Sequence, residues 1–183
     1  GKTFIAANLA TCFAIKGKKV VAVDLDLRKA SLSRYVGHER TGVANYLVGQ
    51  NVKLEDITFK EKDGESPLDI IPVGTIPPNP TELLTSPRLE QLLAELRKRY
   101  DCIFIDCPPI EVVADAAIIS KQADLTLFVI RAGLLERSML PELDRIYADG
   151  KYHNLSVILN GTEAAYRRYG YHKYGYRYGY YSY

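Results

Sequence analysis

The sequence predicts an α/β fold in which a parallel sheet is flanked by helices, and three features of the chain support this prediction. Apolar runs occupy positions 20–23 and 102–105 without the alternation of a half-exposed strand. Such runs alternate with segments of helical periodicity, an order that requires right-handed crossovers between parallel strands. Both runs end in an aspartate, Asp24 or Asp106. The 183 residues suffice for one domain with a sizeable core.

The helices and strands are placed by their apolar patterns and by the glycines and prolines between them. The expected order is a helix up to residue 15 closed by Gly17, a strand over 20–24, short helices and turns over 31–50, an exposed charged segment over 52–67, a strand over 68–73, a proline-stiffened loop over 74–79, a helix over 80–99, a strand over 101–106, a helix over 115–122, a strand over 125–130, a helix over 135–149 and a strand over 155–159. The helix over 80–99 carries its leucines on one face, as a core helix does.

The first residues, Gly1-Lys2-Thr3, open a helix and match the second half of a phosphate-binding P-loop. In such a loop the helix N-terminus holds phosphates, the lysine reaches the β and γ phosphates, and the threonine hydroxyl binds magnesium. We therefore expect Gly1 to Phe4 to contact a nucleotide. The first half of the motif and the strand before it would precede Gly1, so the chain is expected to be a fragment of a longer one.

Carboxylates follow two of the buried strands. Asp24 and Asp26 stand at the end of the first strand, at the edge where open α/β sheets bind ligands. Two carboxylates so close together favour a bound cation, and oxygen ligands favour Mg²⁺. Asp106 ends a second strand and precedes Pro108 and Pro109, an arrangement typical of the Walker B motif. Together with the P-loop half, these carboxylates predict a site that hydrolyses a nucleotide or transfers a phosphoryl group.

Two further polar residues follow later strands. Arg131 is expected either to face the same cleft or to be an ordinary surface arginine. Asn160 has a side-chain amide that either reads the edge of a purine ring or makes a turn with Gly161. The three histidines lack metal-ligand spacing, and no chemistry is assigned to them.

Composition and charge exclude several classes of protein. The formal net charge is +2, yet residues 163–183 hold four basic residues against one acidic residue, so the rest of the chain is close to neutral. No general nucleic-acid surface is expected on residues 1–162. The three cysteines lack metal spacing, which is typical of reduced thiols in a cytosolic compartment. There is no signal peptide and no apolar run of the roughly 18 residues that a membrane span needs, so the chain is expected to be soluble.

Residues 163–183 form a tyrosine-rich tail, expected to be flexible and distinct from the domain over 1–162. Glycines and basic residues interrupt any apolar face, so the tail cannot build a core. It can serve as the substrate of the phosphoryl-transfer site, stack on single-stranded nucleic acid or drive self-association. The tail leaves the last strand at the edge that carries the aspartates, which favours the first function. The tyrosines expected to accept phosphate are Tyr169, Tyr171, Tyr174, Tyr176, Tyr178, Tyr180, Tyr181 and Tyr183.

With these residues read, the sequence resembles the bacterial tyrosine kinases of capsule and exopolysaccharide assembly over essentially its whole length. The resemblance implies a P-loop NTPase-like fold of the deviant Walker type. The segments that carry it are Gly1-Lys2-Thr3, Val-Asp-Leu-Asp-Leu-Arg-Lys over 23–29, Gly42 to Gly49, Pro-Pro-Asn-Pro-Thr-Glu-Leu-Leu over 77–84, Ile-Asp-Cys-Pro-Pro over 105–109 and the terminal tyrosines.

The resemblance also implies roles for individual residues. Lys2 would hold the phosphates of ATP, and Mg²⁺ would be positioned by Thr3, Asp26 and Asp106. Asp24 would lie near the attacking tyrosine hydroxyl, where it orients the hydroxyl or accepts its proton. One departure is that cysteine stands at 107, where the family commonly has threonine.

The family further implies an ATP-dependent tyrosine autokinase in which the tail of one subunit is phosphorylated by its neighbour in a ring that comes apart afterwards. Its partners would be a membrane polysaccharide co-polymerase, fused upstream or separate, and a tyrosine phosphatase, with the kinase held at the bacterial inner membrane. No nucleic acid is expected as a partner. The alternatives are a partitioning or septum-site type ATPase with nucleotide-driven dimerisation, or a tail that binds nucleic acid.

Overall fold

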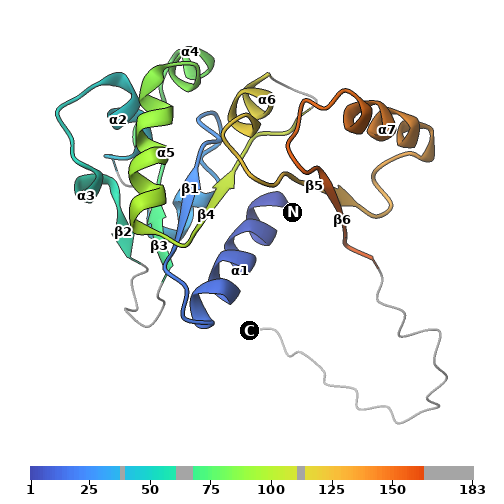
Figure 1. Ribbon diagram of the computed structural model, residues 1–183, viewed down its shortest axis with the longest axis horizontal. Helices are drawn as coiled ribbons and strands as arrows, with labels where there is room; N and C mark the ends of the chain where they lie inside the picture. The colour runs from blue at the N-terminus through green and yellow to red at the C-terminus, as the bar shows by residue number, and fades with distance from the viewer. Residues whose placement is uncertain (38–39, 61–67, 111–113, 163–183) are drawn as a thin grey trace, which may run out of the picture.

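The computed structural model describes residues 1–37, 40–60, 68–110 and 114–162. A four-stranded sheet has the order β2-β3-β1-β4 (Figure 1). In it, β1 (Val20–Asp24) pairs in parallel with β3 (Leu68–Ile71) and with β4 (Cys102–Asp106). The short β2 (Phe59–Lys60), which the sequence pattern did not predict, pairs antiparallel with β3. The parallel arrangement predicted for β1, β3 and β4 is confirmed.

The last two strands form a sheet of their own. β5 (Leu127–Arg131) and β6 (Ser156–Asn160) are parallel and place Arg131 opposite Asn160 at their ends. The strands of the described residues thus divide into two sheets, with no ladder between β4 and β5. Helix α1 (Lys2–Ile15) contacts β4, and Gly1 at its start lies against Asn160 of β6. The start of α1 therefore lies where the two sheets approach each other.

Strand β1 is buried on both of its faces, which explains why its apolar run does not alternate. Val21 and Val23 pack in one core with the leucines of α5 (Pro87–Arg99). Val20 and Ala22 pack in a second core against the small side chains of α1. To the first core α5 contributes Leu89, Leu92, Leu93 and Leu96, and to the second α1 contributes Ala7, Ala10 and Ala14.

The prediction of one continuous helix over 80–99 is wrong. The segment forms α4 (Pro80–Leu84) and then α5, with Ser86 extended between them at φ −71° and ψ 148°. Pro87 explains the break, because a proline disfavours helical backbone at the residue before it and is well suited to the first turn of a new helix. The predicted helix over 135–149 begins late, because α7 starts at Leu140 with Pro141 in its first turn.

The remaining helices are short and lie near the ends of the strands. They are η1 (Leu32–Val36), α2 (Val43–Val48), α3 (Leu54–Ile57), α6 (Asp115–Ser120), η2 (Arg137–Met139) and α7 (Leu140–Ala148). None of the helices in the described ranges has the length and apolarity to cross a membrane. The predicted tail over 163–183, with its tyrosines, lies outside the described residues.

Candidate active site

The candidate site lies at the edge of the four-stranded sheet where β1 and β4 end. Asp24 and Asp106 are the last residues of these strands and stand opposite each other in the parallel register. The first turn of α1 reaches the same edge, where the Thr3 hydroxyl donates a hydrogen bond to Asp106 Oδ2 over 2.7 Å. The structure therefore joins the P-loop threonine to the Walker B carboxylate, 103 residues apart in the chain.

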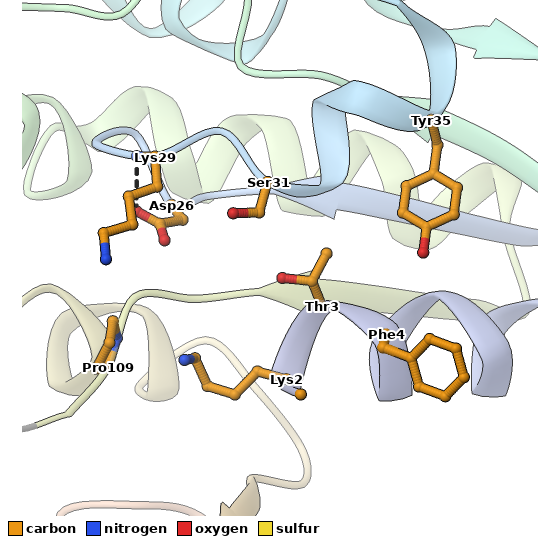
Figure 2. A pocket seen from close by; sticks show the side chains of 9 residues that line it. Lys2, Thr3, Phe4, Asp26, Lys29, Ser31, Tyr35 and Pro109 are labelled. Atoms are coloured by element: carbon orange, nitrogen blue, oxygen red, sulfur yellow. Dashed lines mark hydrogen bonds between the residues drawn. The ribbon is translucent and has the colours of Figure 1, made fainter.

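A cavity of about 450 Å³ opens at this edge. Figure 2 shows Lys2, Asp26 and Lys29 at one end of it and the aromatic rings of Phe4 and Tyr35 at the other. The lining residues come from the start of α1, from the segment between β1 and the end of η1, and from the loop after β4: Gly1, Lys2, Thr3, Phe4, Asp26, Lys29, Ser31, Tyr35 and Pro109. The cavity thus has a charged end and an aromatic end.

Asp26 is held at the cavity by a tight turn after β1. Its Oδ1 accepts hydrogen bonds from the backbone N–H groups of Arg28 at 3.3 Å and Lys29 at 3.1 Å (Figure 2). Ala30 closes the turn with its N–H on the Asp26 carbonyl, at a positive φ of 49° that alanine seldom adopts. The Asp26 residue is only 6% exposed. A carboxylate fixed in this way is ordered before any ligand binds.

The oxygen donors around Asp106 fit magnesium. Burial raises the pKa of Asp106, while the Thr3 hydrogen bond and the nearby Lys2 ammonium lower it. No cluster of three His, Cys, Asp or Glu ligands exists among the described residues. Mg²⁺ does not need one, because it ordinarily binds one or two carboxylates and completes its shell with water and substrate phosphates. Asp26, Asp106 and the Thr3 hydroxyl therefore suit a magnesium–nucleotide complex better than a metal held by protein alone.

Asp24 lies beneath the cavity and does not line it. The residue is completely buried, and its carboxylate accepts hydrogen bonds from the Asp26 N–H at 3.1 Å and from both the N–H and the hydroxyl of Ser33 at 2.8 Å each. Ser33 Oγ also accepts a hydrogen bond from the Val73 N–H at 2.8 Å. Burial raises the pKa of Asp24 to about 6, against the opposing effect of Ser33. In this structure Asp24 supports the loop that carries Asp26.

The two candidate residues on the second sheet lie outside the cavity. A Cβ on Gly1 would come within 2.4 Å of Asn160 Nδ2, so these two residues are immediate neighbours and a larger residue at position 1 would displace the Asn160 amide. Asn160 Oδ1 accepts the Gly161 N–H at 2.8 Å, which is the turn that the sequence offered as one interpretation. Arg131 stands opposite Asn160 and is exposed. Neither residue lines the cavity, so nucleotide binding stays a prediction for both.

Three cavity residues had no assigned function from sequence, namely Lys29, Ser31 and Tyr35. Lys29 and Ser31 follow the aspartates closely, and the sequence signal for them was their place in the loop after a ligand-binding strand end. Tyr35 gave no local signal, because only the folded path of η1 brings its ring to α1. Figure 2 shows the rings of Tyr35 and Phe4 pointing into the same end of the cavity.

A polar network around the buried Asp115 was also not anticipated. Arg28 Nε donates to Asp115 Oδ2 at 3.1 Å, and Arg28 Nη2 donates to Thr81 Oγ1 at 3.1 Å. Thr81 in turn donates to Asp115 Oδ1 at 2.7 Å. The network ties the loop of Asp26 to the starts of α4 and α6. Cys107 lies close by, and burial raises the pKa of its thiol, so it remains protonated.

The chain is similar to a known protein family and to several known proteins. Residues 1–136 match an AAA domain family, AAA_31. The chain is 38% identical over 187 residues to the putative tyrosine-protein kinase EpsB of Ralstonia solanacearum, a match that covers 100% of this chain and 24% of EpsB. It is 36% identical over 174 residues to the tyrosine-protein kinase YwqD of Bacillus subtilis, which covers 94% of this chain and 72% of YwqD. The chain belongs to the bacterial tyrosine kinases. It spans about a quarter of the length of EpsB.

Solved structures support membership of the bacterial tyrosine kinases. The kinase domain of Escherichia coli tyrosine kinase ETK superposes with a TM-score of 0.77 at 32% identity, covering 95% of this chain and 67% of that one. The septum site-determining protein MinD of Pyrococcus horikoshii, complexed with Mg-ADP, superposes with a TM-score of 0.69 at 26% identity, covering 91% and 68%. The P-loop NTPase-like fold predicted for this kinase-family chain is therefore confirmed.

Proposed function

We propose that this chain is the catalytic domain of a protein-tyrosine autokinase, which transfers the γ-phosphoryl group of ATP to tyrosines of residues 163–183. The observation that carries the proposal is the 2.7 Å hydrogen bond between Thr3 and Asp106, at a cavity that Lys2 and Asp26 also line. Sequence identity to ETK above that to MinD supports a kinase over a dimerising ATPase.

The residues at the charged end of the cavity perform distinct parts of the transfer. Lys2, at the N-terminus of α1, neutralises the β and γ phosphates beside the free N–H groups of the first helical turn. Thr3, Asp26 and Asp106 hold Mg²⁺, which when bound supplies positive charge against the phosphoryl oxygens. Because phosphoryl transfer depends mainly on position and charge, these four side chains supply the main charges for the transfer in this proposal.

Asp24 serves the acceptor indirectly in this proposal. A phenol has a pKa near 10, so a tyrosine hydroxyl needs orientation and a route for its proton. The buried Asp24 carboxylate orders the segment from Asp26 to Ser33 through hydrogen bonds at 2.8–3.1 Å. It thereby sets the position of the Asp26 carboxylate, which the attacking hydroxyl would meet in the cavity.

The acceptor tyrosines belong to a neighbouring copy in a ring-like homo-oligomer. Each phosphate adds roughly −1.5 to −2 charges, so modification turns the basic tail strongly acidic. In this proposal the change of charge weakens the contact between the tail and its neighbour, and the assembly then comes apart. In this way the kinase would regulate the polymerisation and export of capsule or exopolysaccharide, together with a membrane co-polymerase that holds it at the bacterial inner membrane and a tyrosine phosphatase that resets it.

The test is phosphate mapping in the full-length protein. Incubation with Mg²⁺ and ATP, followed by mass spectrometry, is expected to find phosphate on several tyrosines between Tyr169 and Tyr183, and none in Asp26→Asn. Mixing Asp26→Asn with an active copy whose tail tyrosines are all phenylalanine distinguishes transfer between subunits from transfer within one subunit. Phosphate on the Asp26→Asn copy supports transfer between subunits.

Two results would contradict this function. ATP turnover with every tyrosine unmodified would favour the partitioning or septum-site type ATPase. Binding of single-stranded nucleic acid by the tail, independent of ATP and falling steeply with salt, would assign the tail to nucleic acid instead.

A further inference from the structure

Two aromatic side chains line the cavity and take no part in the transfer described above. Phe4 is 62% exposed and Tyr35 is 44% exposed. Figure 2 shows both rings at the end of the cavity away from Lys2 and Asp26. Large apolar rings that stay accessible inside a cavity offer contact area to a ligand that itself carries a ring.

Tyr35 is presented to the cavity by a rigid support. Within η1, Leu32 is fully buried and Val36 is 4% exposed, so both anchor the turn on the core. Between them Ser33 donates two hydrogen bonds of 2.8 Å to the buried Asp24. A ring held on such a support loses little further freedom when a ligand stacks on it, which favours binding.

The position of the rings indicates which ring-bearing group they meet. Asn160 lies against Gly1 towards β6, and neither Asn160 nor Arg131 lines the cavity. A base held near Asn160 and a ring held by Phe4 and Tyr35 would therefore lie on different sides of the phosphate-binding turn. Phosphoryl transfer keeps the attacking and leaving oxygens in line on opposite sides of the phosphorus. With the base near Asn160, as this proposal requires, the aromatic end is left for the attacking group.

We propose that Phe4 and Tyr35 form an acceptor subsite, which binds the phenol ring of a tyrosine from residues 163–183 of a second copy of this chain. The inference rests on the proposed function. The sequence favours this occupant, because residues 163–183 hold nine of the 14 tyrosines of the chain. From Tyr166 onward the tyrosines follow one another at intervals of one to three residues, so neighbours can enter the subsite in turn.

The subsite directs one bond-making event. The phenol oxygen forms a bond to the γ-phosphorus while the bond from that phosphorus to the bridging oxygen breaks. The electron pair of the broken bond stays on ADP, and the phenolic proton passes to water. The products are a phosphotyrosine ester and ADP, and no oxidant or reductant is needed.

Peptide binding to Tyr35 variants of the full-length protein tests the proposal. The probe is a fluorescently labelled peptide with the sequence of residues 169–183, titrated by anisotropy in the presence of Mg-ADP. Tyr35→Leu is expected to weaken binding about tenfold or more, from loss of the ring contact. Tyr35→Phe keeps the ring and should stay within about twofold of the unsubstituted protein. Tyr147→Leu, which removes a 70% exposed tyrosine of α7 outside the cavity, is the matched control.

Kinetics with the same peptide as phosphate acceptor gives an independent reading. In Tyr35→Leu the KM for the peptide should rise by a similar factor while the KM for ATP stays the same, and Phe4→Leu should add to the effect on the peptide. Unchanged peptide binding and an unchanged peptide KM in Tyr35→Leu would overturn the subsite. A rise in the KM for ATP alone would also overturn it, because the rings would then contact adenine. If the unsubstituted protein forms no phosphotyrosine yet its peptide binding still depends on Tyr35, the subsite stands and the kinase function fails.

Discussion

The two sheets of this molecule differ sharply in how they are packed. All five residues of β1 are buried, with α1 on one face and α5 on the other. In β5 both end residues are exposed, and α7 has no buried residue. Val157 and Leu159 of β6 are 53% and 58% exposed. Figure 1 shows α7 beside β5 and β6, away from the helices that cover the four-stranded sheet.

The difference in packing divides the molecule into two parts with different proposed roles. We call α1, β1, β3, β4 and α5 the catalytic half, and residues 125–160 the β5–β6 unit. The proposed catalytic groups Lys2, Thr3, Asp26 and Asp106 all belong to the catalytic half or to the loop that it anchors. The two other predicted site residues, Asn160 and Arg131, lie at the edge of the β5–β6 unit. Substitutions in the first part should therefore reduce rate and stability, and those in the second should reduce nucleotide affinity.

The largest effect is expected from Asp106→Asn in the catalytic half. The substitution keeps the size of the side chain but removes the negative charge that Thr3 contacts and that would hold magnesium. Phosphotyrosine formation should fall by about 10²–10³-fold, the usual cost of losing one preorganised electrostatic group. Initial rates with Mg-ATP measure it, and an unchanged thermal midpoint verifies the fold. A loss below about tenfold would remove Asp106 from the machinery.

Truncating one leucine in each part tests the packing contrast directly. Leu92→Ala removes a side chain with no exposure from the core beneath β1 and should lower the free energy of unfolding by about 2–5 kcal/mol. Leu159→Ala removes a side chain that is 58% exposed and should change it by about 0.5 kcal/mol or less. Urea unfolding of both variants measures the difference. Equal losses would show that the β5–β6 unit is packed as tightly as the catalytic half.

Asp24 should make the stability of the catalytic half depend on pH. Burial raises its pKa to about 6 from an ordinary value of 3.8, so between these values the folded protein binds more protons than the unfolded chain. Stability should therefore fall as pH rises from about 4 to about 6, by on the order of 3 kcal/mol from this group. Urea unfolding without nucleotide or Mg²⁺, compared with Asp24→Asn, isolates the effect. A pH profile identical in Asp24→Asn would contradict it.

Asn160→Ala should give the smallest effect on catalysis, in the β5–β6 unit. If the amide contacts the nucleotide base, its loss should raise the KM for ATP by about three- to tenfold, the cost of one hydrogen bond, with kcat nearly unchanged. Steady-state kinetics with varied ATP measures both constants. A fall in kcat at constant KM would mean that Asn160 acts on the start of α1, through its contact with Gly1.

Much of this site could be predicted because it depends on features that are local in the sequence. Parallel strands bring their carboxyl ends to one edge, so an aspartate at the end of each buried run and a P-loop helix must meet there. The contact of Thr3 with Asp106 follows from that rule. The break before α5 could also have been read from Pro87, since the residue before a proline avoids helical backbone.

Other parts of the site depend on contacts that no local pattern contains. Asp24 and Asp26 are equivalent in the sequence, and only the return of Ser33 to Asp24 turns one carboxylate inward and leaves the other at the cavity. Tyr35 reaches the cavity for the same reason. The contact between Arg28 and Asp115 joins residues 87 positions apart, with no motif that pairs them. Such pairings are set by tertiary packing.

The most direct test of kinase function is the ratio of ADP to phosphotyrosine formed in one reaction of the full-length protein with Mg-ATP. A kinase forms one ADP for each phosphotyrosine until the tail is modified, so we expect a ratio near one in the early phase, with Asp106→Asn forming little of either product. ADP that accumulates at the same rate while no phosphotyrosine appears would contradict the proposed function and show that the site hydrolyses ATP.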